Sequence, residues 1–319
     1  MNYQVLPRLL LSLCLGAVTT SAALTAESAA LTQIKQDGRI RMGMYLGFEG
    51  LSFIQKGKKV GLEVELAQLV CEELSKDLGR EVQPEIVNQE WAQIIQELRN
   101  GKYHTAFSAV IPAQLYATFD VAYTRSYLDT GPVICCQEKD GGPGKAVTAK
   151  VASLADKRVV VINDPAVRRA LRRCGVYVPA DDGKTDLEHS FPKAATEAAV
   201  LDKAAGLIAV KELLQIDEMP VIYKMLAEGE VDAGVIDLGI IWWVANDSER
   251  WAARIYAFDK PIGPYIYSAV TRSEDADLSK LLDAAIGRAK ASPRYQEILK
   301  RWHGGADPNW KLAAEAFFE

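Results

Sequence analysis

The chain has 319 residues, of which 49 % are hydrophobic and 25 % are charged, and its formal net charge at pH 7 is −5. An acidic balance of this size lacks the basic field that nucleic-acid-binding proteins use, so we expect no nucleic-acid partner. At about 150 residues per domain, the length accommodates two domains with a sizeable core.

The N-terminus has the features of a secretory signal peptide. Arg8 is followed by an apolar run from Leu9 to Val18, which is too short to span a bilayer. Ser21 and Ala23 then stand at −3 and −1 of a cleavage point, so we expect residues 1–23 to be removed and the mature protein to be periplasmic. An uncleaved N-terminal membrane anchor is the alternative.

The first half of the chain alternates between strand-like and helix-like segments. Val64, Leu66, Ala67, Leu69, Val70 and Leu74 recur at helical spacing. The expected order is strand, helix, strand, helix, strand over residues 38–47, 58–78, 79–87, 90–101 and 103–111. This rhythm is typical of a parallel α/β sheet.

A second α/β unit follows and ends near Ile255. Its segments are a strand at 130–137, a Gly/Pro-rich loop, a strand at 157–164, a helix at 165–175, and a helix–strand–helix run at 219–247. The last segment, 264–304, predicts a strand and two amphipathic helices. Two such units suggest two lobes with a cleft at the carboxyl ends of their strands.

The cysteines leave the disulfide state open. Cys71 lies on an apolar helical pattern and is expected to be buried. Cys135 and Cys136 are adjacent in a strand-like run, so their side chains should point to opposite faces. One of them could bridge to Cys174 in an oxidising compartment, a question that spacing does not settle.

Catalytic and metal-binding patterns find little support. The chain has three histidines and shows no nucleophile, zinc-protease or P-loop motif. We therefore expect neither an enzyme nor a bound metal or cofactor.

Four stretches in the same order resemble the extracytoplasmic solute-binding proteins of the amino-acid ABC-transporter type. They are "RMGMYLGFEGLSFIQKGKKVGLEVELAQLVCEEL", "WAQIIQELRNGKYHTAFSAV", "LAEGEVDAGVIDLGIIWW" and "AIGRAKASPRYQEILKRWHG". The resemblance covers residues 32–304. It implies the α/β, two-lobed type II periplasmic-binding-protein fold, in which each lobe is a mostly parallel sheet flanked by helices and two crossover strands act as hinges.

The same resemblance implies domain boundaries. Residues 31–131 together with 263–319 should form lobe 1, and residues 132–262 should form lobe 2. The hinges are then expected near residues 129–133 and 261–267.

The resemblance also implies a binding site between the lobes. Phe48 and Trp91 stand where the family's aromatic lids sit, Ser108 keeps a hydroxyl position, and Asp237 stands where a carboxylate binds the ligand ammonium. The expected ligand-binding set is completed by Glu49, Ala109, Val110, Asp164, Pro165 and Ala166.

This sequence departs from the family where the family holds a ligand carboxylate. Leu115 or Tyr116 occupies the position of the family's Arg. In the second lobe the anion-binding turn reads "NDPAV", where Pro165 removes a backbone donor and Asp164 adds a negative charge. Glu49 adds another. The ligand is therefore expected to be amine-bearing or polar-neutral rather than a plain α-amino acid.

Several of these residues have a structural alternative. Asp237 is also placed to cap the following helix, Trp91 to fill a core and Ser108 to end a strand, whereas Phe48 is expected to be exposed to the cleft. Trp242 and Trp243 are expected in helix–sheet packing. For Arg125, pairing with Asp129 is favoured over replacement of the missing Arg.

The leading hypothesis is a monomeric protein that closes over a small-molecule solute and delivers it to ABC permease subunits. The alternative is an accessory binding protein of a periplasmic quinoprotein dehydrogenase, a role that relatives with eroded carboxylate sites have. A dehydratase on the same fold is a third reading, for which Glu49 and Asp237 are the candidate acid/base pair.

Overall fold

The computed structural model describes residues 27–112, 120–164, 167–168, 171–172, 174–177 and 207–304. The predicted signal peptide, Leu115, Tyr116, Pro165 and Ala166 lie outside the described residues. Within the described part, no helix is long and apolar enough to cross a membrane.

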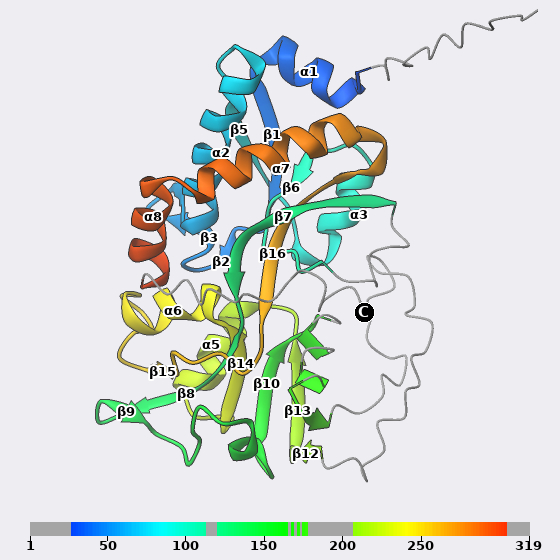
Figure 1. The fold of residues 1–319 in the computed structure, drawn as a ribbon. Coiled ribbons are helices and arrows are strands. Elements are labelled where there is room, and N and C mark those ends of the chain that lie inside the picture. Colours follow the sequence, from blue (N-terminus) through cyan, green and yellow to red (C-terminus); the bar gives the residue numbers. More distant parts are fainter. Residues whose placement is uncertain are drawn as a thin grey trace, which may run out of the picture.

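The first sheet combines strands from both ends of the chain (Figure 1). The strand Arg39–Met44 pairs in parallel with both of its neighbours, whereas the strand Tyr265–Arg272 is antiparallel to both of its neighbours. In spatial order the strands are β5 (Gln83–Asn88), β1 (Arg39–Met44), β6 (Thr105–Ala106), β16 (Tyr265–Arg272) and β7 (Val121–Thr130). Four of the five strands thus point in the same direction and β16 runs against them, and β7 and β16 are the strands that connect to the second sheet.

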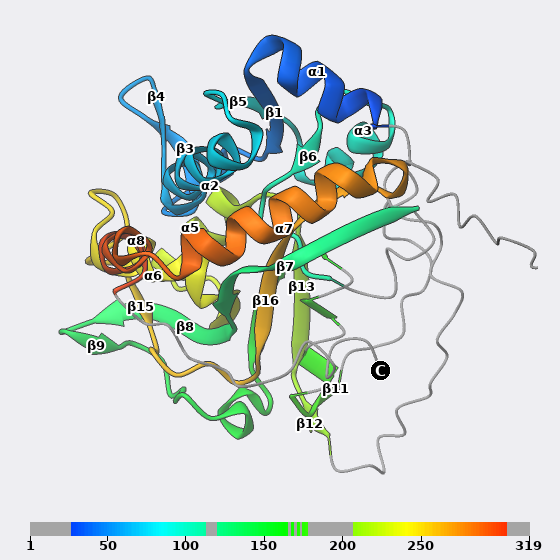
Figure 2. The ribbon, with the colours of Figure 1, turned by 45° about the horizontal axis from the view of Figure 1, so that its top comes forward.

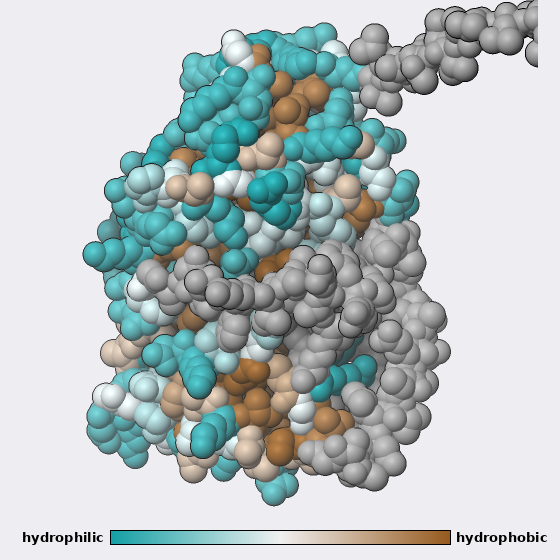
Figure 3. Space-filling model, in the orientation of Figure 1, coloured by the Kyte–Doolittle hydropathy of each residue, from teal (hydrophilic) through white to brown (hydrophobic). Residues whose placement is uncertain are grey.

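Helices and a hairpin cover this sheet. They are α1 (Ala29–Asp37), the hairpin β2 (Gly47–Phe48), β3 (Ser52–Gln55) and β4 (Lys58–Val60), α2 (Leu62–Leu78), η1 (Trp91–Gln93), α3 (Ile94–Arg99), η6 (Ser273–Asp275), α7 (Ala276–Lys290) and α8 (Pro293–His303). The apolar stripe predicted for α2 is buried except at Val64, which is partly exposed. Side chains over α1, α2 and α7 are mainly hydrophilic on the face shown in Figure 3, as expected of helices with one solvated side.

The second sheet repeats the arrangement. Its strands are β13 (Glu212–Ile216), β10 (Arg158–Ile162), β14 (Ala233–Asp237), β8 (Pro132–Lys139) and β15 (Ile255–Ala257), with β9 (Gly142–Pro143) paired to β8. The first three are parallel and β8 is antiparallel to β14. Among the described residues of this half, the structure also has η3 (Val151–Leu154), β11 (Val176–Tyr177), β12 (Ile208–Ala209), α5 (Met219–Ala227) and α6 (Leu238–Asn246).

The described cysteines form no disulfide. Cys71, Cys135, Cys136 and Cys174 are all free thiols, which answers the question that the sequence left open for this part of the chain. Cys135 and Cys136 pack into different hydrophobic clusters, so the prediction that they face opposite sides of their strand is confirmed.

The chain passes twice between the two sheets (Figures 1 and 2). β7 continues through Gly131 into β8, and the chain returns from β15 through residues 258–264 into β16. The two passages touch at glycines. A Cβ on Gly131 would lie 2.1 Å from the carbonyl oxygen of Gly263 and 2.8 Å from Cβ of Pro261. Only a residue without a side chain fits here.

Gly131→Ala is therefore expected to force the two passages apart. Because the nearest atom belongs to backbone, the strain cannot be relieved by a rotamer change, and we expect a loss of about 1–3 kcal/mol in the free energy of unfolding. Urea denaturation measures it. Gly142→Ala is the matched control, since nothing lies within 4 Å of the Cβ it would add. Equal unfolding midpoints for the two variants would contradict the close contact.

Candidate ligand site

The predicted site residues follow the carboxyl ends of parallel strands. Phe48 lies beyond β1, Trp91 beyond β5, Ser108 beyond β6, Asp164 beyond β10, and Asp237 ends β14. In open α/β sheets ligands bind at these ends, because loops there converge from several strands. The first three positions belong to one sheet and the last two to the other.

An aromatic cluster lies at the end of the first sheet. The ring of Phe48 meets those of Tyr45 and Trp91 edge to face, with centroids 4.9 and 5.5 Å apart. Phe48 is only 2 % exposed, so the expectation that it is open to the cleft is wrong: its neighbours cover it on both sides. Tyr45 and Trp91 are partly exposed and form the accessible part of the cluster.

Tyr45 is a member of the site that the sequence reasoning missed, although its position directly after β1 was a signal for it. The pKa of its phenol is raised by burial and by the nearby carboxylates of Glu90 and Glu218. Glu90 precedes η1 in the first sheet's half, whereas Glu218 precedes α5 beside the second sheet. The aromatic cluster therefore lies in an acidic environment to which both parts of the chain contribute.

The segment from Ser108 to Val110 frames this cluster rather than offering free polar groups. The backbone N–H of Tyr45 donates to Oγ of Ser108 at 3.0 Å, and the N–H of Ser268 donates to the carbonyl of Val110 at 3.0 Å. Ser108 is fully buried. Its hydroxyl thus ties two strand ends together, as the structural alternative for this residue anticipated.

Ala109 takes an unusual conformation that a buried glutamate holds. Its φ is 47°, a left-handed value that a residue with a side chain adopts at a cost. Its N–H donates to Oε1 of Glu63 at 2.6 Å and to the Tyr127 hydroxyl at 2.9 Å. Tyr127 and Ser52 also donate to the Glu63 carboxylate.

Glu63 is another residue that the sequence reasoning missed. It lies in the first turn of α2 and is fully buried, with no cation among its described partners. Burial raises the pKa of this carboxyl to about 7, although its hydrogen bonds act in the opposite direction. Nothing in the sequence indicated that Glu63 is buried. Its side-chain partners, Ser52 on β3 and Tyr127 on β7, are distant from it in the chain.

Asp237 ends β14 and precedes α6. It occupies the cap position of α6, yet its carboxylate forms no cap hydrogen bond. Oγ1 of Thr130 accepts from the N–H of Gly239 at 3.0 Å, and the carbonyl of Gly131 accepts from the N–H of Leu238 at 2.8 Å. Groups of the first passage between the sheets therefore accept the hydrogen bonds of the first N–H groups of α6, and the Asp237 carboxylate is not needed as a helix cap.

The environment of Asp237 favours a positive ligand. Its carboxylate accepts a hydrogen bond from the Tyr267 hydroxyl and forms no ion pair among the described residues. Burial and, to a smaller extent, the nearby negative charge of Asp164 raise the pKa of Asp237 to about 7, although the hydrogen bond from Tyr267 acts in the opposite direction. Asp164 is itself buried. A cation between these carboxylates would relieve both the desolvation and the repulsion.

The side chain of Glu49, which follows β2, accepts hydrogen bonds from residues that follow α6. Oε2 accepts from Oγ of Ser248 at 3.3 Å and Oε1 from Nε1 of Trp251 at 3.4 Å. A pocket of about 310 Å³ lies beside these contacts, and its lining includes Glu49, Phe53, Trp243 and Arg250. Because the partners of Glu49 differ from those of Asp237, the two carboxylates are not arranged as a hydrogen-bonded acid/base pair.

Arg125 and the tryptophan pair lie in structural contacts. Both Nε and Nη2 of Arg125 donate to Oδ2 of Asp283, at 3.0 and 2.7 Å, so the predicted pairing with Asp129 is wrong. Asp129 pairs with Lys290 instead.

The ring of Trp243 packs against Phe53 and Trp302, with centroids 5.0 and 5.9 Å apart. A Cβ on Gly304 would lie 2.5 Å from the ring of Trp242. The expected packing role of the pair is confirmed, but its partners are α8 and the β2–β3 hairpin rather than the face of a sheet. Within the described residues, no group of His, Cys, Asp and Glu side chains could hold a metal ion.

Solved structures with the same fold include several binding proteins. ArgBP from T. maritima, solved as a mutant, is 22 % identical, with 86 % of this chain and 99 % of that one covered and a TM-score of 0.56. A periplasmic binding protein of Salmonella typhimurium with high arginine specificity is 18 % identical, covering 83 % and 99 %, with a TM-score of 0.57. The ancestral amino-acid-binding protein AncCDT-1, a precursor of cyclohexadienyl dehydratase, is 19 % identical, covering 86 % and 99 %, with a TM-score of 0.61.

The sequence also matches a family directly. Residues 40–305, which include both sheets and every described candidate residue, match the bacterial extracellular solute-binding proteins of family 3. The two mixed α/β sheets agree with that match. The chain therefore belongs to the bacterial extracellular solute-binding proteins, family 3.

Proposed function

We propose that this protein captures a small amine-bearing solute without a carboxylate group, in a periplasmic cleft between two lobes, and delivers it to an ABC permease. The observation that carries the proposal is the buried carboxylate of Asp237, which has a neutral hydroxyl and no cation as its partner among the described residues. A protonated amine would complete this site with a charge-assisted hydrogen bond.

The proposed site has an aromatic part and an acidic part. Tyr45 and Trp91 are partly exposed, and the faces of their rings would attract a cation, while Asp164 and Asp237 supply negative charge from the other sheet. In the sequence, the position at which relatives hold a ligand carboxylate carries Leu115 or Tyr116 instead of Arg. Arginine is thus a poor candidate for this chain despite the arginine-binding relatives, because its carboxylate would lack a partner.

The domain boundaries are part of the proposal. Lobe 1 would comprise residues 31–131 and 263–319, lobe 2 residues 132–262, and the glycine contact between the two passages would lie at the hinge. Closure would bring Glu90 toward Glu218, and a bound cation would offset their repulsion. Transport is preferred to the accessory role beside a dehydrogenase because family membership supports it and no contact described here favours the accessory role.

A thermal-shift screen of the purified protein tests the proposal. The compounds are mono- and diamines, quaternary ammonium ions, α-amino acids and sugar acids, each at millimolar concentration. An amine at 100 times its dissociation constant should stabilise the protein by about 2.7 kcal/mol. Stabilisation by α-amino acids or sugar acids but by no amine would contradict the proposed ligand class, and a screen without any response would contradict solute binding itself.

A further inference from the structure

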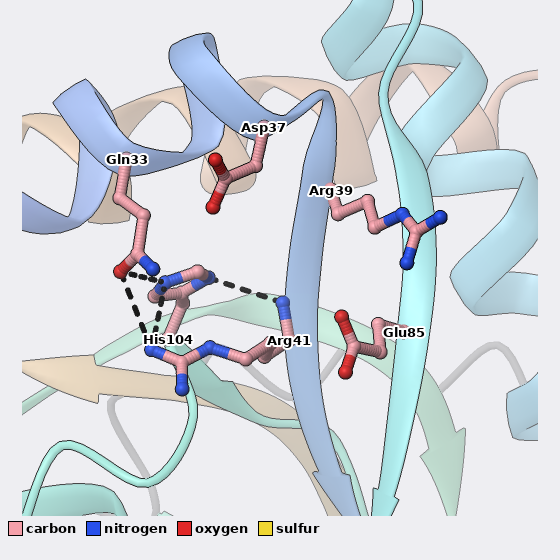
Figure 4. Close-up of a pocket in the computed structure, with 6 residues that line it drawn as sticks. All are labelled: Gln33, Asp37, Arg39, Arg41, Glu85 and His104. Atoms are coloured by element: carbon pink, nitrogen blue, oxygen red, sulfur yellow. Dashed lines mark hydrogen bonds between the residues drawn. The ribbon is translucent and has the colours of Figure 1, made fainter.

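A polar pocket of about 460 Å³ lies at the end of the first sheet that is opposite the candidate ligand site (Figure 4). It is found where β1 and β5 begin, beneath α1. Its lining consists of Gln33, Asp37, Arg39, Arg41, Glu85 and His104. The volume is within the usual range for small-molecule pockets, about 300–1,000 Å³.

Secondary structure explains why these charges gather. Arg39 and Arg41 are two residues apart on β1, and alternate residues of a strand share one face. Glu85 is the register partner of Arg41 on the parallel strand β5. Gln33 and Asp37 are four residues apart on α1 and therefore lie on one side of that helix. Two cations and two anions thus face the same space from three elements.

One of the residues that line the pocket is the buried His104. Nδ1 of His104 accepts the backbone N–H of Arg41 at 3.0 Å, which leaves the ring proton on Nε2, 3.2 Å from Oε1 of Gln33. Burial and the charges of Arg41 and Arg272 together lower the pKa of His104 to about 4, whereas Asp37 acts in the opposite direction. The ring is neutral at pH 7 and adds no charge to the pocket.

The guanidinium of Arg41 has no anionic partner among the described residues. It is partly buried and Nη2 lies 3.3 Å from Oε1 of Gln33, a neutral acceptor, while its Nε is out of contact with water and has no acceptor at all. A desolvated cation that lacks an anion is costly. Although Glu85 is its register partner, the two side chains form no ion pair in the described part of the chain.

The other three charged side chains that line the pocket also lack partners among the described residues. Within the described residues, the side chains of Asp37, Arg39 and Glu85 form no hydrogen bond or ion pair. The pocket therefore offers two guanidinium groups and two carboxylates that an occupant with both kinds of charge would pair at the same time. A simple anion would be repelled by Asp37 and Glu85, and a simple cation by Arg39 and Arg41.

We propose that this pocket is a second binding site, which takes a small zwitterion with one carboxylate and one ammonium group. The carboxylate is received by Arg39 and Arg41, and the ammonium by Asp37 and Glu85. Because the lining comes entirely from residues 33–104, occupancy requires no movement of the second sheet. Binding at this site is thus independent of the interlobe site and of its ligand.

L-alanine is the probe, because it carries both charges and little else, with acetate and methylammonium as single-charge controls. Histidine ring NMR signals report on the pocket directly, since the chain has only three histidines. We expect the His104 signals to shift saturably with L-alanine, and the affinity for acetate or methylammonium to be at least about tenfold lower.

Glu85→Gln and Arg39→Gln are the informative variants. Both side chains are exposed, so folding should be unaffected, and each should weaken L-alanine binding at least about tenfold. Asp237→Asn is the control, because it alters the interlobe site and should leave the His104 response unchanged. The proposal is overturned if L-alanine leaves the His104 signals unmoved, if acetate alone binds as tightly, or if neither charge variant weakens binding.

Discussion

Asp237→Asn is expected to weaken binding of an amine ligand about 100-fold while leaving the fold intact. Removing one partner of a buried charge pair costs about 2–5 kcal/mol, and tenfold in affinity corresponds to about 1.4 kcal/mol. Asparagine has the same shape and its amide oxygen can still accept from the Tyr267 hydroxyl, so the loss should lie in affinity rather than in stability. Isothermal titration with an amine from the screen measures it.

The pH dependence of binding distinguishes a charge effect from a shape effect. The pKa of Asp237 is about 7 without ligand, and an amine stays protonated until about pH 10. Affinity should therefore rise from pH 6 to pH 8 as the carboxylate ionises, and Asp237→Asn should abolish this rise. Asp283→Asn is the matched control, because it removes a charge from the partly exposed pair with Arg125, while its amide oxygen can still accept from the backbone N–H of Arg125. An unchanged affinity in Asp237→Asn would show that the site lies elsewhere.

Glu63→Ala is expected to lower the free energy of unfolding by roughly 3 kcal/mol. It would leave the buried Tyr127 hydroxyl without its acceptor and open a cavity beside Ser52. Ala109 would lose one of the two acceptors that hold its left-handed conformation next to the proposed site. Urea denaturation gives the stability, and ligand titration of the same variant shows whether the Ser108–Val110 frame is displaced.

Glu63→Gln separates the hydrogen bonds from the charge. Its amide oxygen can replace the carboxylate as acceptor for Tyr127, so it should lose much less stability than the Ala variant. The pKa of Glu63 is about 7 in the folded protein, above its ordinary value of 4.5, so the folded state binds the proton more tightly and ionisation destabilises it as pH rises through this window. Relative to the wild type, Glu63→Gln should gain stability from pH 5 to pH 8. A constant difference would mean that Glu63 does not titrate there.

The positions of the strand ends were predicted correctly from the sequence, but the side chains that contact the residues there were not. Asp237, Trp91 and Ser108 could be placed because each follows a strand whose pattern is legible. The burial of Phe48 could not, since it results from Tyr45 and Trp91, which reach it from separate loops. Arg125 was assigned to a neighbour four residues away, whereas its partner Asp283 is more than a hundred residues distant on α7. Pairings across the chain depend on topology, which spacing does not encode.

Several elements escaped prediction for a related reason. Residues 103–111 pattern as a strand, yet only Thr105–Ala106 pair, because the backbone turns at Ala109 toward Glu63. Residues 212–216 and 121–130 carry charged or polar residues among their apolar ones, and pairing with β10 and β16 makes them strands. Their conformation is thus decided by neighbours distant in the sequence.

By itself, the sequence determined the α/β character, the order of the main helices and strands, and the family. These features are local, since periodicity, composition and short motifs encode them. Only the tertiary structure decided that Glu63 and Asp237 are buried with pKa values near 7, that two glycines meet where the chain passes between the sheets, and that Arg41 lacks an anionic partner among the described residues. Desolvation, close contact and unmatched charge arise between distant segments, and they exist only once the chain has folded.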